Sequence, residues 1–78
     1  MILIDKLQGY PNKRKRYSHL VSDVSFDELH SFAERIGVAR HWFHKNHYDL
    51  REPEHSRALE TGATLVSTRE LARRMVKV

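Results

Sequence analysis

The chain has 78 residues, which is enough for one small domain with a modest hydrophobic core. It contains no cysteine, so disulfides and thiolate zinc sites are excluded, and any bound metal must have nitrogen and oxygen ligands. The formal net charge of +4 is typical of proteins with an anionic partner such as nucleic acid, although a solvated basic surface explains it equally well.

The first predicted element is a short strand over residues 2–4, where two isoleucines flank a leucine. This apolar start is too short for a signal peptide, and no stretch is long enough to cross a bilayer, so we expect a cytoplasmic protein without a membrane partner. Residues 9–12 form a turn signal, and the basic residues 13–16 that follow are expected in an exposed loop. Residues 17–21 are predicted to be extended and to carry His19.

The clearest predicted helix begins at Ser25, because Ser25 and Glu28 fit a capping box, and it ends at Gly37, which supplies a left-handed stop. Apolar residues at helical spacing define its inner face, with Phe32 at the edge. These residues are Phe26, Leu29, Ala33 and Ile36. His30 follows Phe26 by one helical turn and is therefore expected on the inner face or at its rim.

The pattern after Gly37 is less regular. Residues 38–43 are compatible with a strand or with irregular structure, and residues 47–50 are predicted to be extended. A second helix is predicted over about residues 53–61, because proline is favoured in the first turn and Gly62 can end the helix.

A buried strand over residues 63–66 and a terminal helix opened by the capping box of residues 67–70 complete the pattern. The residues expected to face inward on this helix are Leu71, Ala72, Met75 and Val76, and those expected to face water or a partner are Arg69, Arg73, Arg74 and Lys77. Alternating strands and helices favour an α/β fold. We therefore predict one domain over residues 1–78, with about three helices on a short, at least partly parallel sheet.

Three histidines, His41, His44 and His47, recur at a spacing of three residues. On a helix they would lie along one side and could bind a transition metal through their imidazoles. The ordinary explanation is an aromatic-rich, solvated loop. If the segment is extended, His47 and Asp49 share a face that His44 does not join.

A second set combines His19, His30, His47 and Asp49, which come from three different predicted elements. Convergence of separate elements is typical of active sites, so these are the candidate catalytic residues. His30 could be a general acid or base oriented by Asp49, while His19 and His47 could contact a phosphate or complete a metal site. The alternative is that His30 is a hydrogen-bonded core histidine and that Asp49 caps a turn or pairs with Arg51.

Basic and aromatic side chains indicate where a phosphate-bearing ligand could bind. The run at residues 13–16 is flanked by Tyr10 and Tyr17, and such side chains neutralise phosphates and stack on bases, although four consecutive charges also suit a solvated loop. The candidate phosphate- or ligand-binding residues are Lys13, Arg14, Lys15, Arg16, Tyr48 and Arg57. Trp42 and Phe43 are expected in the core; if exposed, they would mark a binding surface.

Several stretches of the chain occur in a recognisable order. They are Ile4-Asp5, Ser18-His19-Leu20, Glu28-Leu29-His30, Phe32-Ala33, Trp42-Phe43, His47-Tyr48-Asp49-Leu50, Arg57-Ala58, Gly62-Ala63 and Ser67 to Leu71. This order resembles an uncharacterised family of short bacterial and phage proteins, classified as a domain of unknown function. The resemblance implies that Asp5, His19, His30, His47, Tyr48, Asp49 and Arg57 belong to a shared pattern.

The chain departs from that family pattern at two places. The family more often has two consecutive acids after its first strand, whereas Lys6 follows Asp5 here. The family also often has other residues in place of His41 and His44. The resemblance therefore implies that the run of three histidines is not the family's site.

Two main hypotheses about function follow. The first is a small basic binding module for a phosphate-bearing ligand, foremost nucleic acid, that uses the basic loop and the cluster of His and Asp side chains. The second is a phosphoesterase or nuclease-like enzyme that uses His19, His30, His47 and Asp49, with or without a divalent metal. A phage-type regulator that binds a host protein is a third. Because no motif with a known reaction is present, enzymatic activity, the cofactor and the metal stay open.

Overall fold

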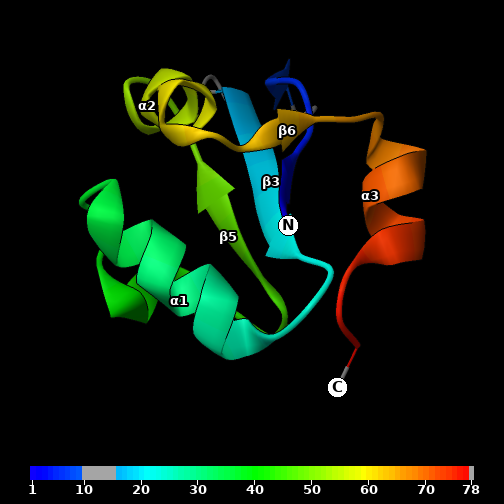
Figure 1. Ribbon diagram of the computed structural model, residues 1–78. Coiled ribbons are helices and arrows are strands. Elements are labelled where there is room, and N and C mark those ends of the chain that lie inside the picture. Colours follow the sequence, from blue (N-terminus) through cyan, green and yellow to red (C-terminus); the bar gives the residue numbers. More distant parts are fainter. Residues whose placement is uncertain (10–15, 78) are drawn as a thin grey trace.

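Figure 1 shows the computed structural model of the protein, which describes residues 1–9 and 16–77. The strands are β1 (Ile2–Ile4), β2 (Gln8–Gly9), β3 (Arg16–Ser22), β4 (Phe43–His44), β5 (His47–Leu50) and β6 (Thr64–Leu65). The helices are α1 (Phe26–Arg35), the short 3₁₀ helix η1 (Arg40–Trp42), α2 (Glu54–Thr61) and α3 (Thr68–Arg74). This arrangement confirms the predicted α/β class with three α-helices on a short sheet.

The sheet is mixed, with the strand order β4-β5-β3-β1-β6 and with β2 paired to the start of β3. Strand β1 runs antiparallel to β3 and parallel to β6, and β5 runs antiparallel to both β3 and β4. The predicted parallel pairing is therefore confirmed for β1 and β6.

Side chains alternate along β1, β3 and β5, so the sheet has two differently covered faces. Helices α1 and α2 cover one face and α3 covers the other (Figure 1). Among the described residues, the buried apolar side chains of the α1–α2 face are Ile2, Ile4, Leu20, Leu29, Phe32, Ala33, Ile36, Tyr48, Leu50, Ala58 and Ala63. Those of the α3 face are Leu3, Val21 and Leu71. Each large apolar side chain removed from water contributes roughly 1.5–3 kcal/mol, so even this small second core holds α3 in place.

Helix α1 has the predicted ends. The Ser25 side chain accepts a hydrogen bond from the Glu28 amide (3.0 Å), and Gly37 has a positive φ of 79° just after the helix. The Glu28 carboxylate accepts a hydrogen bond from the Ser22 hydroxyl (2.5 Å) and so extends the cap into β3. The prediction for Phe32 was wrong, because this side chain is only 6 % exposed and lies fully in the core.

The segment that carries the three histidines is not one continuous helix. Residues 43–44 pair with residues 47–48 as an antiparallel hairpin, and Lys45 in its two-residue turn has a φ of 58°. The helical arrangement of His41, His44 and His47 is therefore wrong: His41 lies in η1 and the other two lie on paired strands.

Two predictions of burial near the end of the chain were also wrong. Residues 63–66 were expected to form a buried strand, but both residues of β6 are exposed, because β6 is an edge strand that pairs on one side only. On α3 Leu71 is buried as expected, whereas Ala72 is exposed because the helix contacts the sheet along a narrow stripe.

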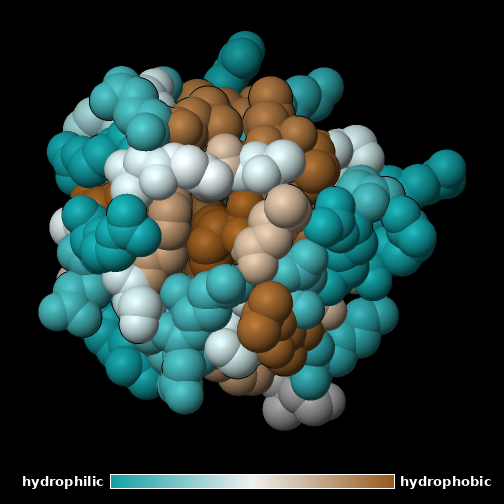
Figure 2. All heavy atoms as spheres, in the orientation of Figure 1, coloured by the Kyte–Doolittle hydropathy of each residue, from teal (hydrophilic) through white to brown (hydrophobic). Residues whose placement is uncertain are grey.

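The surface of the molecule is mixed in polarity. Figure 2 shows apolar side chains toward the middle of one face, surrounded by hydrophilic ones. None of the helices in the described parts of the chain is long and apolar enough to span a membrane.

The prediction that Trp42 is in the core was wrong, because its side chain is 52 % exposed.

Candidate metal centre

Three neighbouring strands place polar side chains together on the α3 face of the sheet. In the β3–β5 pair His19 lies directly opposite Asp49, and His47 lies two residues before Asp49 on the same face. Asp5 follows β1, and its amide donates a hydrogen bond to the His19 carbonyl (3.3 Å). The strand register therefore brings together four polar side chains that are far apart in the sequence.

The Asp5 carboxylate is fully buried and binds His19 at two points. One carboxylate oxygen accepts the His19 backbone N–H (2.6 Å), and the other lies 2.8 Å from Nδ1 of the His19 ring. The Thr68 hydroxyl (2.8 Å) and the Gln8 amide (3.1 Å) also donate to this second oxygen. Because an ionised carboxylate only accepts hydrogen bonds, Nδ1 of His19 carries a proton, and in the neutral ring the lone pair is then on Nε2.

Burial and hydrogen bonding have opposing effects on the pKa values of Asp5 and His19. Burial alone would raise the pKa of Asp5, but the hydrogen bonds from His19 and Thr68 outweigh it and lower the pKa below its usual value. The hydrogen bond to Asp5 raises the pKa of His19, partly offset by burial. Asp5 is therefore an ionised partner that holds the His19 ring in one orientation.

His47 is oriented in a similar way on β5. Its Nδ1 lies 2.9 Å from Oδ1 of Asn46, and its Nε2 lies 3.3 Å from Oδ1 of Asp49. The same Asp49 oxygen is 4.0 Å from Nε2 of His19. The centres of the His19 and His47 rings are 5.3 Å apart. Burial lowers the pKa of His47, although Asp49 opposes this effect, so the imidazole favours its neutral, ligating form.

One ligand atom from each of His19, His47 and Asp49 lies within 4.8 Å of the other two. Ligand atoms that share one zinc-sized ion are roughly 3.0–3.4 Å apart, so small side-chain rotations would close the set around a metal. Asp49 is 43 % exposed, so the cluster is open to solvent. Two imidazoles and one carboxylate are typical ligands of divalent first-row transition metals.

His44 lies closer to this cluster than expected. It pairs directly with His47 across the β4–β5 hairpin, and the two rings are 5.7 Å apart. The expectation that an extended His44 would not share the face of His47 was wrong, because opposite residues of an antiparallel pair project to the same side. His41 instead stacks on Trp42, with 5.7 Å between the ring centres.

His30 lies outside the cluster, although the sequence grouped it there. Its Nδ1 is 2.8 Å from the hydroxyl of Tyr48, whose side chain projects to the α1–α2 face, opposite to His47 and Asp49. Its ring also packs edge-on against Phe43, 4.6 Å away. Burial lowers the pKa of His30, and burial raises the pKa of Tyr48. His30 is thus a hydrogen-bonded, partly buried histidine at the rim of the core, which is close to the alternative interpretation, and Asp49 does not orient it.

The predicted anion-binding residues are spread over the molecule. Arg57 donates to the Ile36 carbonyl at the end of α1 (2.6 Å), which is a structural contact. Arg16 is exposed at the start of β3, and residues 13–15 lie outside the described part of the chain. Tyr48 is fully buried beside His30.

Three supporting residues were missing from the predicted site: Gln8, Asn46 and Thr68. Asn46 directly precedes His47, and a polar residue beside a histidine was the only local signal. Thr68 lies 63 positions after Asp5, so only the tertiary fold reveals their contact. Asp5 itself was implied by the family pattern but was not placed among the site residues.

The chain belongs to the family described as "Protein of unknown function (DUF4031)", whose family model matches residues 2–78. This match confirms the resemblance to a domain of unknown function over nearly the whole chain. No curated protein and no solved structure matches it significantly.

Proposed function

We propose that this DUF4031 protein binds one divalent first-row transition-metal ion through His19, His47 and Asp49, and that the metal binds a phosphate-bearing ligand. The main support is the arrangement of the two imidazoles. Each has its Nδ1 engaged by a side-chain oxygen and its Nε2 near the same Asp49 oxygen. Carboxylates and amides in this supporting position orient metal-bound histidines in many proteins.

The donor set indicates which ions would bind. Imidazole nitrogen suits zinc, iron, cobalt and similar ions, whereas magnesium and calcium prefer oxygen ligands. With two nitrogens and one oxygen from the protein, we expect Zn²⁺ or Co²⁺ to bind far more tightly than Mg²⁺.

Charge connects the metal to a phosphate. Without a cation, the carboxylates of Asp5 and Asp49 would repel a phosphate from the cluster. A bound divalent ion reverses that local charge, and three protein ligands leave coordination positions for phosphate oxygens. The excess of basic residues, concentrated at residues 13–16, supports nucleic acid or a nucleotide as the ligand.

A second candidate function is hydrolysis of a phosphate ester. An open coordination position can hold a water molecule whose pKa a zinc-like ion lowers toward about 7, which makes hydroxide available as a nucleophile. The solvent exposure of Asp49 favours this candidate, because substrate and water could both reach the ion. Release of product from a phosphodiester by the metal-loaded protein, and its loss in His47→Ala, would support it.

Metal binding is best tested by calorimetric titration of chelator-treated protein with Zn²⁺, Co²⁺ and Mg²⁺. We expect one Zn²⁺ or Co²⁺ per chain and a loss of at least roughly tenfold in affinity for His19→Ala and His47→Ala. His41→Ala is the matched control, because it removes a histidine that stacks on Trp42 rather than facing the cluster. Equal Zn²⁺ affinity of His47→Ala and the wild type would contradict the proposal.

A further inference from the structure

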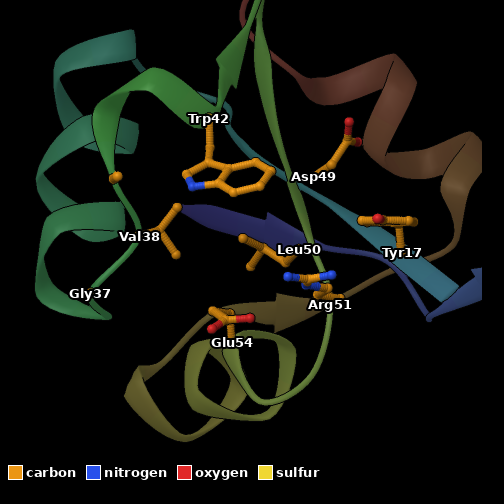
Figure 3. Close-up of a pocket in the computed structure, with 9 residues that line it drawn as sticks. Tyr17, Gly37, Val38, Trp42, Asp49, Leu50, Arg51 and Glu54 are labelled. Carbon is orange, nitrogen blue, oxygen red and sulfur yellow. The ribbon is translucent and has the colours of Figure 1, made fainter. Parts of the chain in front are cut away.

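A pocket borders the candidate metal centre at the free edge of β5 (Figure 3). In the part of the chain that the structure describes, strand β4 pairs with His47 and Tyr48 and not with β5 from Asp49 onward. The pocket occupies this edge and has a volume of about 160 Å³. Its lining includes Tyr17, Val38, Trp42, Asp49, Arg51 and Glu54.

Trp42 gives the pocket an accessible aromatic wall. Helix η1 presents this side chain at 52 % exposure, and it is the only tryptophan in the chain. In Figure 3 the indole ring lies on one side of Leu50 and the Arg51 guanidinium lies on the other. An exposed indole beside an apolar floor is suited to stacking on a planar ring.

The polar groups of the pocket are also suited to a heteroaromatic ring. Arg51 can donate hydrogen bonds to ring nitrogen or carbonyl oxygen, and Glu54 can accept them from amino or imino groups. An apolar pocket with a few convergent polar groups is typical of small-molecule sites. A closed cavity of about 150 Å³ holds a benzene ring, so this pocket has room for one planar base.

Asp49 connects the pocket to the metal centre, because it lines the first and belongs to the second. Tyr17, on the other side of the pocket, directly follows the basic residues 13–16 in the sequence. We propose that the pocket receives the base of a nucleotide whose phosphate is bound at the metal centre, an inference that rests on the proposed function. The ligand is then a free nucleotide or one nucleotide of a single strand, which share this chemistry.

Fluorescence of Trp42 reports directly on the pocket, since no other tryptophan is present. The Zn²⁺-loaded protein is titrated with nucleoside monophosphates, with a short single-stranded oligonucleotide and with inorganic phosphate. We expect saturable quenching by the nucleotide or the oligonucleotide and little change with phosphate. Quenching by the oligonucleotide alone would assign the ligand to a nucleic-acid strand, whereas quenching by the monophosphates would assign it to a free nucleotide. No quenching by any of them would overturn the inference.

Variants of Trp42 distinguish binding in the pocket from binding at the metal centre. By calorimetry, Trp42→Ala is expected to weaken nucleotide binding at least roughly fivefold, whereas Trp42→Phe keeps most of the affinity. Both variants should bind Zn²⁺ and inorganic phosphate like the wild type, and thermal melts check that they fold. Unchanged nucleotide affinity in Trp42→Ala would reject the base pocket while the metal centre stands. Failure of the wild type to bind Zn²⁺ would instead reject the proposed function and this inference together.

Discussion

The carboxylate of Asp5 accepts two hydrogen bonds from His19, one from the imidazole and one from the backbone N–H of the same histidine. The buried carboxylate therefore fixes both the ring and the strand that carries it. Residues that orient a metal ligand in this way are expected to matter for stability and for binding at once, and the two effects can be measured separately.

The Asp5→Asn substitution tests this double role. An amide cannot accept every hydrogen bond that the carboxylate accepts, so we expect a loss of roughly 1.5–3 kcal/mol in the free energy of unfolding. The His19 ring also loses its fixed orientation, so the affinity for Zn²⁺ should fall roughly 10- to 100-fold. Urea denaturation and calorimetry measure the two quantities. Thr68→Val, which removes a single donor to Asp5, should have a smaller effect on both.

The hairpin geometry makes a prediction about the three neighbouring histidines. If the metal is bound across the β3–β5 pair, His41→Ala should not change the affinity for Zn²⁺, and His44→Ala should change it only severalfold through its neighbour His47. His47→Ala should cause the largest loss. Calorimetry on the three variants gives this order, and equal losses for all three would show that the whole run binds the metal.

The pH dependence of stability in the metal-free protein tests the environment of His30. Burial, reinforced by the charge of Arg40, lowers its pKa in the folded state below the unfolded value of about 6.5. The unfolded chain then binds more protons just below pH 6.5, so this group makes stability fall as the pH decreases through that range. Urea midpoints at pH 8 and pH 5 should therefore differ less in His30→Gln than in the wild type.

The contribution of His19 to stability should change with pH in the opposite direction, so His19 is a control in the same experiment. Its pKa is raised in the folded state, so its contribution to stability is complete below the unfolded value of 6.5 and is lost as the pH rises through the folded value. In His19→Asn the decrease in stability from pH 8 to pH 5 should therefore be larger than in the wild type. A change in the same direction for both variants would contradict the assigned environments.

The basic residues 13–16 give a prediction about salt. Replacement of all four by glutamine should weaken binding to a single-stranded oligonucleotide and make it less sensitive to salt. Each lost phosphate contact reduces the slope of log affinity against log salt by about 0.7, so the slope should change by at most about 3. Fluorescence titrations of Trp42 at several salt concentrations measure it. An unchanged slope would mean that these charges do not contact the ligand.

Local signals predicted much of the fold from the sequence. The Ser25 cap, the Gly37 stop and the apolar spacing between them describe α1 correctly, because helix ends depend on nearby residues. Gly62 has a φ of 120° and ends α2 as expected. The hairpin at residues 43–48 was missed because its turn is Lys45-Asn46 and lacks the glycine that usually marks a two-residue hairpin loop.

The candidate site could be predicted only in part, because its geometry depends on strand register. Alternation in an extended segment correctly paired His47 with Asp49, since residues two apart share a face. Helical spacing correctly placed His30 toward the core but could not say which face of the sheet α1 covers. The contact of Asp5 with Thr68 joins segments from opposite ends of the sequence, which local patterns cannot detect.

The parallel pairing of β1 with β6 has a consequence for how the protein would lose a bound ion. β6 leads directly into α3, whose first residue, Thr68, donates to the carboxylate that holds His19. If α3 frays from the sheet, Asp5 loses the hydrogen bond from Thr68, and the orientation of the ligand His19 is less well fixed. Ion release and detachment of α3 should therefore be thermodynamically coupled, and a bound ion should slow amide exchange in a helix that does not touch it.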